Sequence, residues 1–511
     1  MKAPLFDYEP PRGAGLLVHP TSLPSNTGIG NLGHSAKELI DFISEAGFSY
    51  WQVCPLGPTG YRDSPYQCFS AFAGNPYLID LVPLQAHKLL SKKDLDRLQK
   101  LPHNTVDYGT LFELFWALLE KVYKNFAQSP ASLEEVYGSF ESFKEKKKSW
   151  LFPYACFRAL KNHFKAEPFK RWPQELRSFS DAKRSPLVNT LAGSIDAHQF
   201  YQYLFFAQWK ILKAYAHEKN ITIIGDIPIF VAEDSADVWA NPKIFDLNKD
   251  GTIRTQAGVP PDYFSEDGQL WGNPLYDWGA LKKDGYAWWV ERLRASFQLY
   301  DVIRLDHFRG FDTYWSVDAK AKTARKGAWL KGPGIDFFKK VKQALPQSKF
   351  IAEDLGDLTQ GVEDLLEETG FSRMAILQFA FGSGPKNPYL PHNHKKQLVV
   401  YPGTHDNDTT LGWYNNLDAE TKDHVRRYLQ VSGDAIAWDI IRACYSSTAN
   451  LVIIPIQNLL NLGNEARMNF PGKAEGNWQW RYTEDQLCKL TSSTQYLRDL
   501  TDLYGRLPAS T

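Results

Sequence analysis

Cysteine is scarce in this chain of 511 residues, which has five cysteines and no C-x-x-C pair. Their odd number and wide spacing exclude a disulfide framework or a cysteine-based zinc site as the organising feature. The five are Cys54, Cys68, Cys156, Cys444 and Cys488. Reduced thiols of this kind are typical of proteins inside the cell, so we expect a cytoplasmic location.

Net charge and long hydrophobic runs are also missing. The 58 Lys and Arg residues balance 58 Asp and Glu residues, so no overall field attracts nucleic acid or an anionic membrane. No apolar run reaches the roughly 18 residues that a membrane-spanning helix needs. Residues 1–12 contain proline and acidic side chains but not the apolar segment of a secretory signal. We expect a soluble protein with no nucleic-acid or membrane partner.

The motifs for nucleotides and metals are incomplete. Residues 28–33 match G-x-G-x-x-G, but these glycines lie well beyond the first predicted strand, and the next strand lacks an acid to hold a ribose. Residues 246–251 resemble the start of an EF-hand loop, but the twelfth position is Ala257 instead of Glu. His392 and His394 have no cluster of further ligands beside them. The sequence therefore predicts no cofactor and no metal.

What is present is a series of short apolar segments separated by helical patterns. Eight of them are predicted strands: residues 15–20, 50–56, 221–226, 301–310, 350–354, 373–381, 398–404 and 451–457. This alternation predicts an α/β protein, a (β/α)8 TIM barrel with helical and loop insertions around the C-terminal face of the barrel. We expect a single catalytic domain over residues 1–511. A mainly helical insertion at 84–200 would follow the second strand, and an insertion with an active-site flap at 229–300 would follow the third.

Residues 301–310 organise this prediction. As a strand they place Arg304 and Asp306 on one face with Val302, while Ile303 and Leu305 face the other way. A strand that is apolar on both faces, yet carries an ion pair near its C-terminal end, suits a parallel sheet buried on both sides. An isolated R-x-D is equally compatible with an ordinary internal salt bridge.

Acids at the ends of three other strands favour a functional site instead. Asp226 closes the third strand, Glu353 and Asp354 close the fifth, and Asp406 follows the seventh. Bringing such acids together costs like-charge repulsion and desolvation, which a catalytic role explains better than stability does. In a (β/α)8 barrel these strand ends form the active-site face.

These groups can perform a retaining reaction at a glycosidic bond. One ionised carboxylate attacks the anomeric carbon, and a protonated carboxyl about 5 Å away gives its proton to the leaving oxygen. We expect Arg304 to lower the pKa of Asp306, the nucleophile. Glu353, with negative neighbours and no arginine of its own on its strand, would have a raised pKa and act as acid and base. Asp406, next to His405, would bind sugar hydroxyls and stabilise the transition state.

The sequence also resembles a known family, the amylomaltases, which are 4-α-glucanotransferases of glycoside hydrolase family seventy-seven in the α-amylase clan. The resemblance runs from about residue 15 to residue 472 and rests on six motifs. These are S-P-Y-Q with S-A-F-A-G-N-P-Y within 64–77, G-D-I-P-I-F-V-A-E-D at 225–234, G-V-P-P-D-Y-F with Q-L-W-G-N-P within 258–274, R-L-D-H-F-R-G at 304–310, A-E-D-L-G at 352–356 and G-T-H-D-N-D-T at 403–409. Leu305 departs from the expected Ile or Val, but it faces away from the site.

The resemblance implies a function and a set of site residues. Asp306 would be the nucleophile, Glu353 the acid/base and Asp406 the transition-state stabiliser, with no cofactor. The substrate-binding residues would be Ser64, Tyr66, Asp226, Arg304, His405 and Asp354, with Gln269 and Trp271 on the flap near the acceptor. The reaction would pass a segment of α-1,4-glucan through a covalent β-glucosyl-enzyme to the 4-OH of another glucan. Its partners would be maltooligosaccharides and α-1,4-glucans, with glucose as an acceptor.

Two other functions use the same residues. An α-1,4-glucan hydrolase would need the same carboxylates, because water and a sugar hydroxyl compete for one intermediate. The flap within 258–274 favours transfer, since it would exclude water. An inactive glucan-binding protein is disfavoured because all three carboxylates and Arg304 are present.

Overall fold

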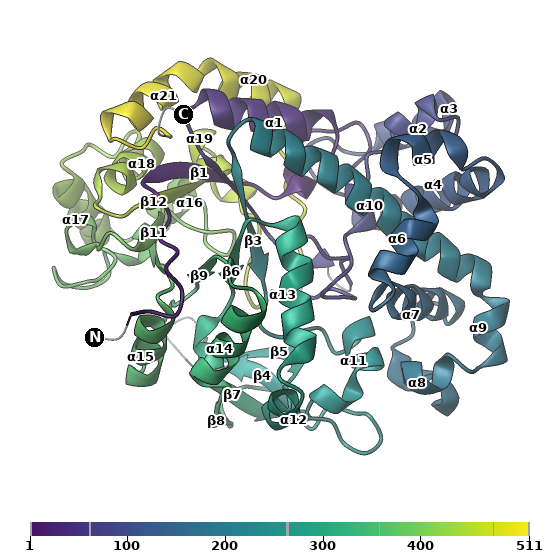
Figure 1. The fold of residues 1–511 in the computed structure, drawn as a ribbon. Coiled ribbons are helices and arrows are strands. Elements are labelled where there is room, and N and C mark those ends of the chain that lie inside the picture. The colour runs from purple at the N-terminus through teal and green to yellow at the C-terminus, as the bar shows by residue number, and fades with distance from the viewer. Residues whose placement is uncertain (1–2, 61–62, 262–264, 357, 474, 509–511) are drawn as a thin grey trace.

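The core of the molecule is a ring of eight parallel strands with helices around it (Figure 1). The computed structural model describes residues 3–60, 63–261, 265–356, 358–473 and 475–508. In sheet order the strands are β10 (Arg373–Ile376), β11 (Leu398–Tyr401), β12 (Leu451–Pro455), β1 (Gly13–Leu17), β2 (Tyr50–Val53), β3 (Thr222–Ile227), β6 (Val302–Leu305) and β9 (Phe350–Ala352). A parallel bridge between Ile351 and Ser372 closes the ring from β9 to β10. The predicted (β/α)8 barrel is confirmed.

The barrel strands are buried on both faces, as their nearly continuous apolar sequences require. Every residue of β1, β2, β6 and β12 is buried. Val302 belongs to the apolar cluster inside the barrel, whereas Ile303 and Leu305 belong to the larger cluster between the strands and the helices. The alternation predicted for this strand is therefore confirmed, and Arg304 points to the inside.

An outer layer of helices covers the barrel. It includes α1 (His34–Glu45), α10 (Ala192–Glu218), α13 (Ala287–Leu299), α14 (Gly334–Ala344), α15 (Gln360–Thr369), α18 (Ile436–Ser446) and α21 (Thr494–Leu503). Most of them pack on a neighbour around the ring: α1 packs against α10 and α21, and α14 packs against α13 and α15. The connection from β10 to β11 differs, because residues 377–397 form only the short 3-10 turns η9 (Leu377–Phe379) and η10 (Pro391–Asn393).

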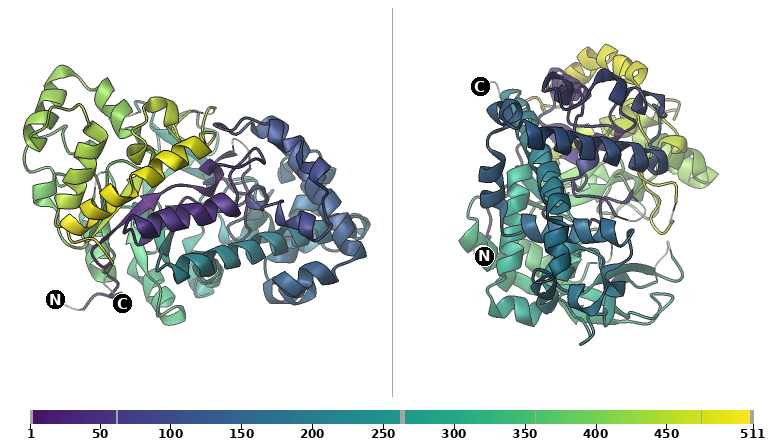
Figure 2. Two further views of the ribbon diagram at one scale, coloured as in Figure 1. Left: turned by 90° about the horizontal axis from the view of Figure 1, so that it is seen from above. Right: turned by 90° about the vertical axis from the view of Figure 1, so that its right-hand side faces the viewer.

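A group of helices lies between β2 and β3. It consists of α2 (Pro83–Ala86), α3 (Lys92–Leu95), α4 (Tyr108–Gln128), α5 (Ala131–Tyr137), α6 (Phe140–Lys147), α7 (Leu151–His163), α8 (Phe179–Ala182) and α9 (Pro186–Thr190), and it ends in α10. These helices gather at one side of the molecule in both figures that show the whole chain (Figure 2). We propose that they are an insertion into one barrel domain, because their buried side chains belong to the same apolar cluster as those of the barrel.

A small antiparallel sheet lies beside the barrel. Its strands, in the order β5-β4-β7-β8, are β5 (Gln269–Pro274), β4 (Thr255–Val259), β7 (Thr313–Asp318) and β8 (Ala328–Lys331). The predicted flap thus contains a β4–β5 pair, although its residues 262–264 lie outside the described residues. The remaining helices are α11 (Ala236–Ala240), α12 (Trp278–Lys283), α16 (Thr410–Asn416), α17 (Ala419–Leu429), α19 (Ile456–Leu459) and α20 (Glu484–Ser492).

Candidate active site

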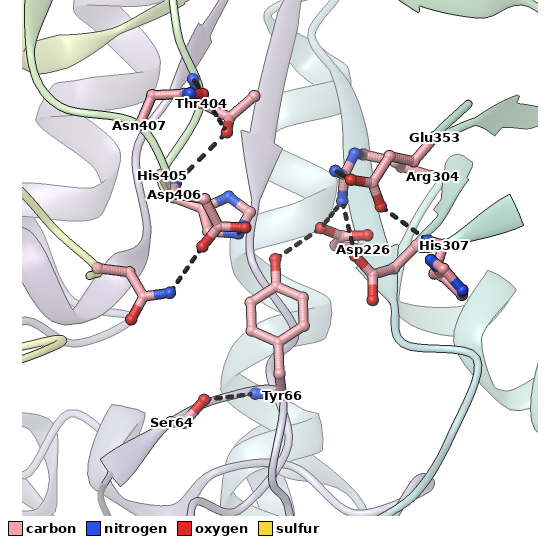
Figure 3. A network of polar contacts seen from close by, with 12 residues as sticks. Ser64, Tyr66, Asp226, Arg304, His307, Glu353, Thr404, His405, Asp406 and Asn407 are labelled. Atoms are coloured by element: carbon pink, nitrogen blue, oxygen red, sulfur yellow. Dashed lines mark hydrogen bonds and ion pairs between the residues drawn. The ribbon is translucent and has the colours of Figure 1, made fainter. Parts of the chain in front are cut away.

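The predicted charged groups lie at the C-terminal ends of the barrel strands. Asp226 and Arg304 are register partners on β3 and β6, and Glu353 directly follows β9, the next strand in the ring. Asp406 follows β11 and lies on the other side of the barrel mouth, with Tyr66 between the two sides (Figure 3). Residues from distant parts of the chain thus meet at the face where (β/α)8 enzymes place their active sites.

Arg304 is the centre of one side, with 1% of its surface exposed. Its Nη1 forms an ion pair with Asp226 Oδ2 and lies 3.6 Å from Asp306 Oδ1. Its Nη2 lies 3.2 Å from Glu353 Oε1. One buried cation therefore faces three carboxylates, which offsets part of their mutual repulsion. Glu353 has no arginine on its own strand, as expected, but the guanidinium of Arg304 reaches it from β6.

A strained turn after β6 holds Glu353 from the other direction. His307 adopts a left-handed conformation with φ of 51°, which is uncommon for a residue other than glycine. Its backbone N–H donates to Glu353 Oε2 over 2.7 Å. Such strain persists only where the surrounding structure stabilises it, and here it aims an amide at a carboxylate of the site.

A side-chain hydrogen bond between the carboxyl groups of Asp306 and Glu353 contributes to the pKa shift of both residues. Burial, together with the charges of Glu353 and Asp226, raises the pKa of Asp306 well above its usual value. Burial opposes the ionisation of Glu353, but Arg304 and the hydrogen bonds from Asp306 and the His307 N–H outweigh it and lower its pKa to about 2. These directions are opposite to those expected from the sequence. For Asp306, burial and the charges of Glu353 and Asp226 outweigh the effect of Arg304, whereas Glu353 has the shorter contact with Arg304.

Asp406 has a different environment. Its side chain is 44% exposed, its Oδ1 accepts a 2.6 Å hydrogen bond from Asn469 Nδ2, and its Oδ2 lies 3.4 Å from His405 Nε2. Arg467 donates to its backbone carbonyl over 2.8 Å. The sequence analysis did not predict Asn469 and Arg467. Both lie in the loop that follows the eighth strand, at the active-site end of the barrel, and this location is the signal that could have identified them.

Tyr66 connects the two sides. Its hydroxyl donates to Asp226 Oδ2 over 2.7 Å, and its ring stacks on that of His405 at 5.1 Å between centroids. The Oγ of Ser64 accepts from the Tyr66 N–H over 3.3 Å, so Ser64 shapes this turn. The loop is anchored further on by Gln202 of α10, whose amide exchanges two hydrogen bonds with the backbone of Gly74.

The flap residues lie beside the Arg304 side. Trp271 packs edge to face on His307 with 4.9 Å between ring centroids, and its Nε1–H donates to Gln269 Oε1 over 3.2 Å. The flap is attached to the loop that carries Tyr66, because Gln67 Nε2 donates to the Trp271 carbonyl and to Asn273 Oδ1. Trp271 and Gln269 thus stand next to the carboxylate cluster without joining its hydrogen bonds.

Asp354 is the predicted residue that the structure places elsewhere. Although it follows Glu353 directly, its Oδ2 lies 2.5 Å from Arg373 Nε and its Oδ1 accepts from the Met374 N–H over 2.9 Å. Arg373 in turn pairs with Glu363 of α15. Asp354 therefore belongs to an ion-pair network between β10 and α15 and not to the cluster around Arg304.

Comparisons with known proteins agree with this geometry. The family model described as 4-alpha-glucanotransferase matches residues 18–487. This chain belongs to the 4-alpha-glucanotransferase family. It is 47% identical to the 4-alpha-glucanotransferase of Thermus thermophilus over 94% of this chain and 96% of that protein, and 45% identical to that of Clostridium butyricum over 96% and 100%. Its fold matches the amylomaltase from Streptococcus agalactiae in complex with acarbose, with a TM-score of 0.93, 36% identity and coverage of 97% and 100%.

Two further observations apply to the described part of the chain. None of its helices combines the length and the apolar character needed to cross a membrane. None of its His, Cys, Asp and Glu side chains gather in groups of three or more that could hold a metal ion.

Proposed function

We propose that this member of the 4-alpha-glucanotransferase family works by a retaining double displacement in which Asp306, Glu353 and Asp406 act on one glycosidic bond. The observation that carries this proposal is that Arg304 holds the carboxyl groups of Asp306 and Glu353 against each other at the barrel mouth. A retaining reaction needs two carboxyls about 5 Å apart, and these two face the same guanidinium group.

In the first displacement, a carboxylate oxygen of Asp306 forms a bond to the anomeric carbon while the bond to the leaving oxygen breaks. Glu353 gives its proton to that oxygen, and the shortened glucan leaves with a free 4-OH. Positive charge develops on the sugar ring, and Asp406 stabilises it from the opposite side of the mouth. Asp226 and Tyr66 bind the donor sugar, and Asp226 Oδ1, which has no partner among the described residues, accepts from a sugar hydroxyl.

The proton must lie on Glu353 when the bond breaks, although Glu353 is the more acidic of the pair in the present arrangement. A glucan that enters between the two carboxyls separates them and ends their hydrogen bond. As the two carboxyls separate, the proton passes from Asp306 to Glu353, because the developing positive charge at the anomeric carbon favours the ionised form of Asp306. The hydrogen bond between the pair thus supplies the proton that the first step uses.

In the second displacement, Glu353 accepts the proton of an incoming hydroxyl, whose oxygen replaces Asp306 at the anomeric carbon. When that hydroxyl is the 4-OH of glucose or of a maltooligosaccharide, a new α-1,4 bond forms. We assign Trp271 and Gln269 to the binding of this acceptor, and the flap would keep water away from the intermediate. The free cysteines fit a reducing compartment, so we place the reaction in the cytoplasm.

Incubation with maltotriose tests this proposal. We expect glucose together with a series of maltooligosaccharides longer than the substrate. Glucose and maltose alone, in hydrolytic ratio, would mean that the enzyme is a hydrolase. Asp306→Asn should abolish transfer while glucan binding is largely retained, and unchanged turnover in this variant would refute Asp306 as the nucleophile.

A further inference from the structure

A second pocket lies outside the barrel mouth, between the inserted helices and the barrel helix α13. It has a volume of about 270 Å³ and is lined by residues of α7, α8, α11 and α13 and of the loop after β2. Figure 1 shows α11 between α13, in the middle of the molecule, and the inserted helices α7 and α8. The volume is just below the roughly 300 Å³ at which pockets for drug-sized ligands begin, so it suits a monosaccharide or a disaccharide.

Aromatic side chains form the walls of this pocket. Phe72 and Trp150 are nearly parallel, with 18° between their planes and 6.3 Å between their centroids, and Trp288 meets Phe72 edge on at 5.8 Å. Tyr154 and Phe179 complete the lining. Flat rings of this kind present large apolar faces at little entropic cost, which is what the apolar faces of a pyranose need.

One polar group of the walls lacks a partner. Trp288 is 9% exposed, and its buried Nε1–H has no hydrogen-bond acceptor among the described residues. Leaving a buried N–H unpaired is unfavourable, and a ligand that accepts its hydrogen bond would remove that cost. Ser149 and Glu291 are exposed at the rim and add further hydrogen-bonding groups.

The charges around the pocket favour a neutral ligand. Glu291 is paired with Arg294, and Arg292 acts on Asp237, which is buried in the lining. Arg292 also lies 5.6 Å from the centre of the Trp288 ring, where a cationic ligand would otherwise be attracted. Both carboxylates thus have a cationic neighbour, so the polar groups are better suited to hydroxyls than to an ammonium group.

We propose that this pocket is a second carbohydrate-binding site, which takes one or two glucosyl units of an α-1,4-glucan. The choice of ligand rests on the proposed function, because the walls alone would accept other neutral sugars. Ser70 and Phe72 of its lining belong to the loop that carries Tyr66 into the active site. A long glucan held here would reach the barrel mouth at a raised local concentration, whereas a chain of three units would occupy the mouth alone.

Titration with maltose, followed by the indole N–H resonance of Trp288, tests the proposal in the full chain. The resonance is assigned by its loss in Trp288→Phe. We expect a saturable shift at millimolar maltose, an affinity roughly tenfold weaker in Trp150→Ala, and one roughly fivefold weaker in Glu291→Ala. Trp438→Ala, which removes a half-buried tryptophan of α18, is the matched control and should bind like the unaltered chain.

Kinetics provide the second measurement. In Trp150→Ala, kcat/KM should fall about tenfold with amylose and stay within about twofold with maltotriose. An unmoved Trp288 resonance, a shift caused by tetramethylammonium instead of maltose, or an equal loss with both substrates would overturn the proposal. If Trp150→Ala does not fold, Glu291→Ala decides, since its side chain is exposed. Absence of transfer from maltotriose in the unaltered enzyme would instead contradict the proposed function.

Discussion

The two sides of the barrel mouth are built differently. On one side Arg304 and Asp226 are 1% and 2% exposed and share a network with Asp306 and Glu353. On the other side Asp406 is 44% exposed and is held by one amide and one imidazole. The first side depends on charges that cannot be separated without leaving one of them buried and unpaired. The second depends on a loop in contact with water, so changes there should affect turnover with little effect on stability.

Removal of the central cation should have the largest effect. Arg304→Gln leaves Asp226 buried without its counter-charge, and we expect the free energy of unfolding to fall by about 3–5 kcal/mol. Turnover of maltotriose should fall by more than about 1,000-fold, because the proposed nucleophile and acid lose their common anchor. Urea denaturation and product analysis measure the two effects.

Arg373→Gln is the matched control, because this arginine of β10 binds Asp354 and Glu363 outside the cluster. It should destabilise the fold by about 1–2 kcal/mol, between the values for exposed and buried ion pairs, and leave turnover near that of the unaltered enzyme. Equal losses of turnover in both variants would show that the Arg304 network has no special connection to the chemistry.

The second-largest effect is expected when Glu353, the proposed proton donor, is replaced. Glu353→Gln should stop transfer from maltotriose but retain reaction with a maltosyl fluoride, whose leaving group needs no acid. The charge of Glu353 is one of the groups that raise the pKa of Asp306, so its removal lowers that pKa. Asp306, as the proposed nucleophile, would attack only when ionised. The acidic limb of kcat/KM with the fluoride should therefore move to lower pH.

The unaltered enzyme with the same fluoride is the reference for this shift. An acidic limb that stays in place would mean that Glu353 does not influence the ionisation of Asp306. An acidic limb that moves to higher pH would mean that Glu353 lowers the pKa of Asp306 instead of raising it. Loss of the fluoride reaction would argue against Glu353 as the proton donor.

The barrel and its mouth could be predicted because each rests on a local pattern. A parallel strand buried on both faces is a short apolar run, and the acid at its end stands out against that run, as with Asp226 and Asp406. The neighbours of a side chain across the ring are not local. Arg304 was assigned to Asp306 because both lie on one strand, whereas the ring order β3-β6-β9 also brings it to Asp226 and Glu353.

Adjacent residues can also separate at the end of a strand. Glu353 turns toward Arg304, and Asp354 turns toward Arg373, although the sequence presents the two as a pair of acids. The expected directions of the pKa shifts were reversed because the pKa of Asp306 depends first on its burial and on the charges of Glu353 and Asp226, which lie on other strands. Nothing in a strand pattern contains that information.

The smallest effect is expected on the exposed side. Asn469→Ala removes the 2.6 Å hydrogen bond to Asp406 Oδ1. The carboxylate of Asp406 stays exposed to water and stays close to His405. Because water can replace the lost amide, stability should change by less than about 1 kcal/mol. Turnover should fall about tenfold, with KM little changed, since the hydrogen bond orients a group that we propose to act mainly in the transition state.

Asn469→Asp would place a second carboxylate beside Asp406 and should reduce turnover further, which separates the effect of orientation from the effect of charge. A loss of stability in Asn469→Ala as large as that in Arg304→Gln would mean that the two sides of the mouth do not differ in the way their burial indicates.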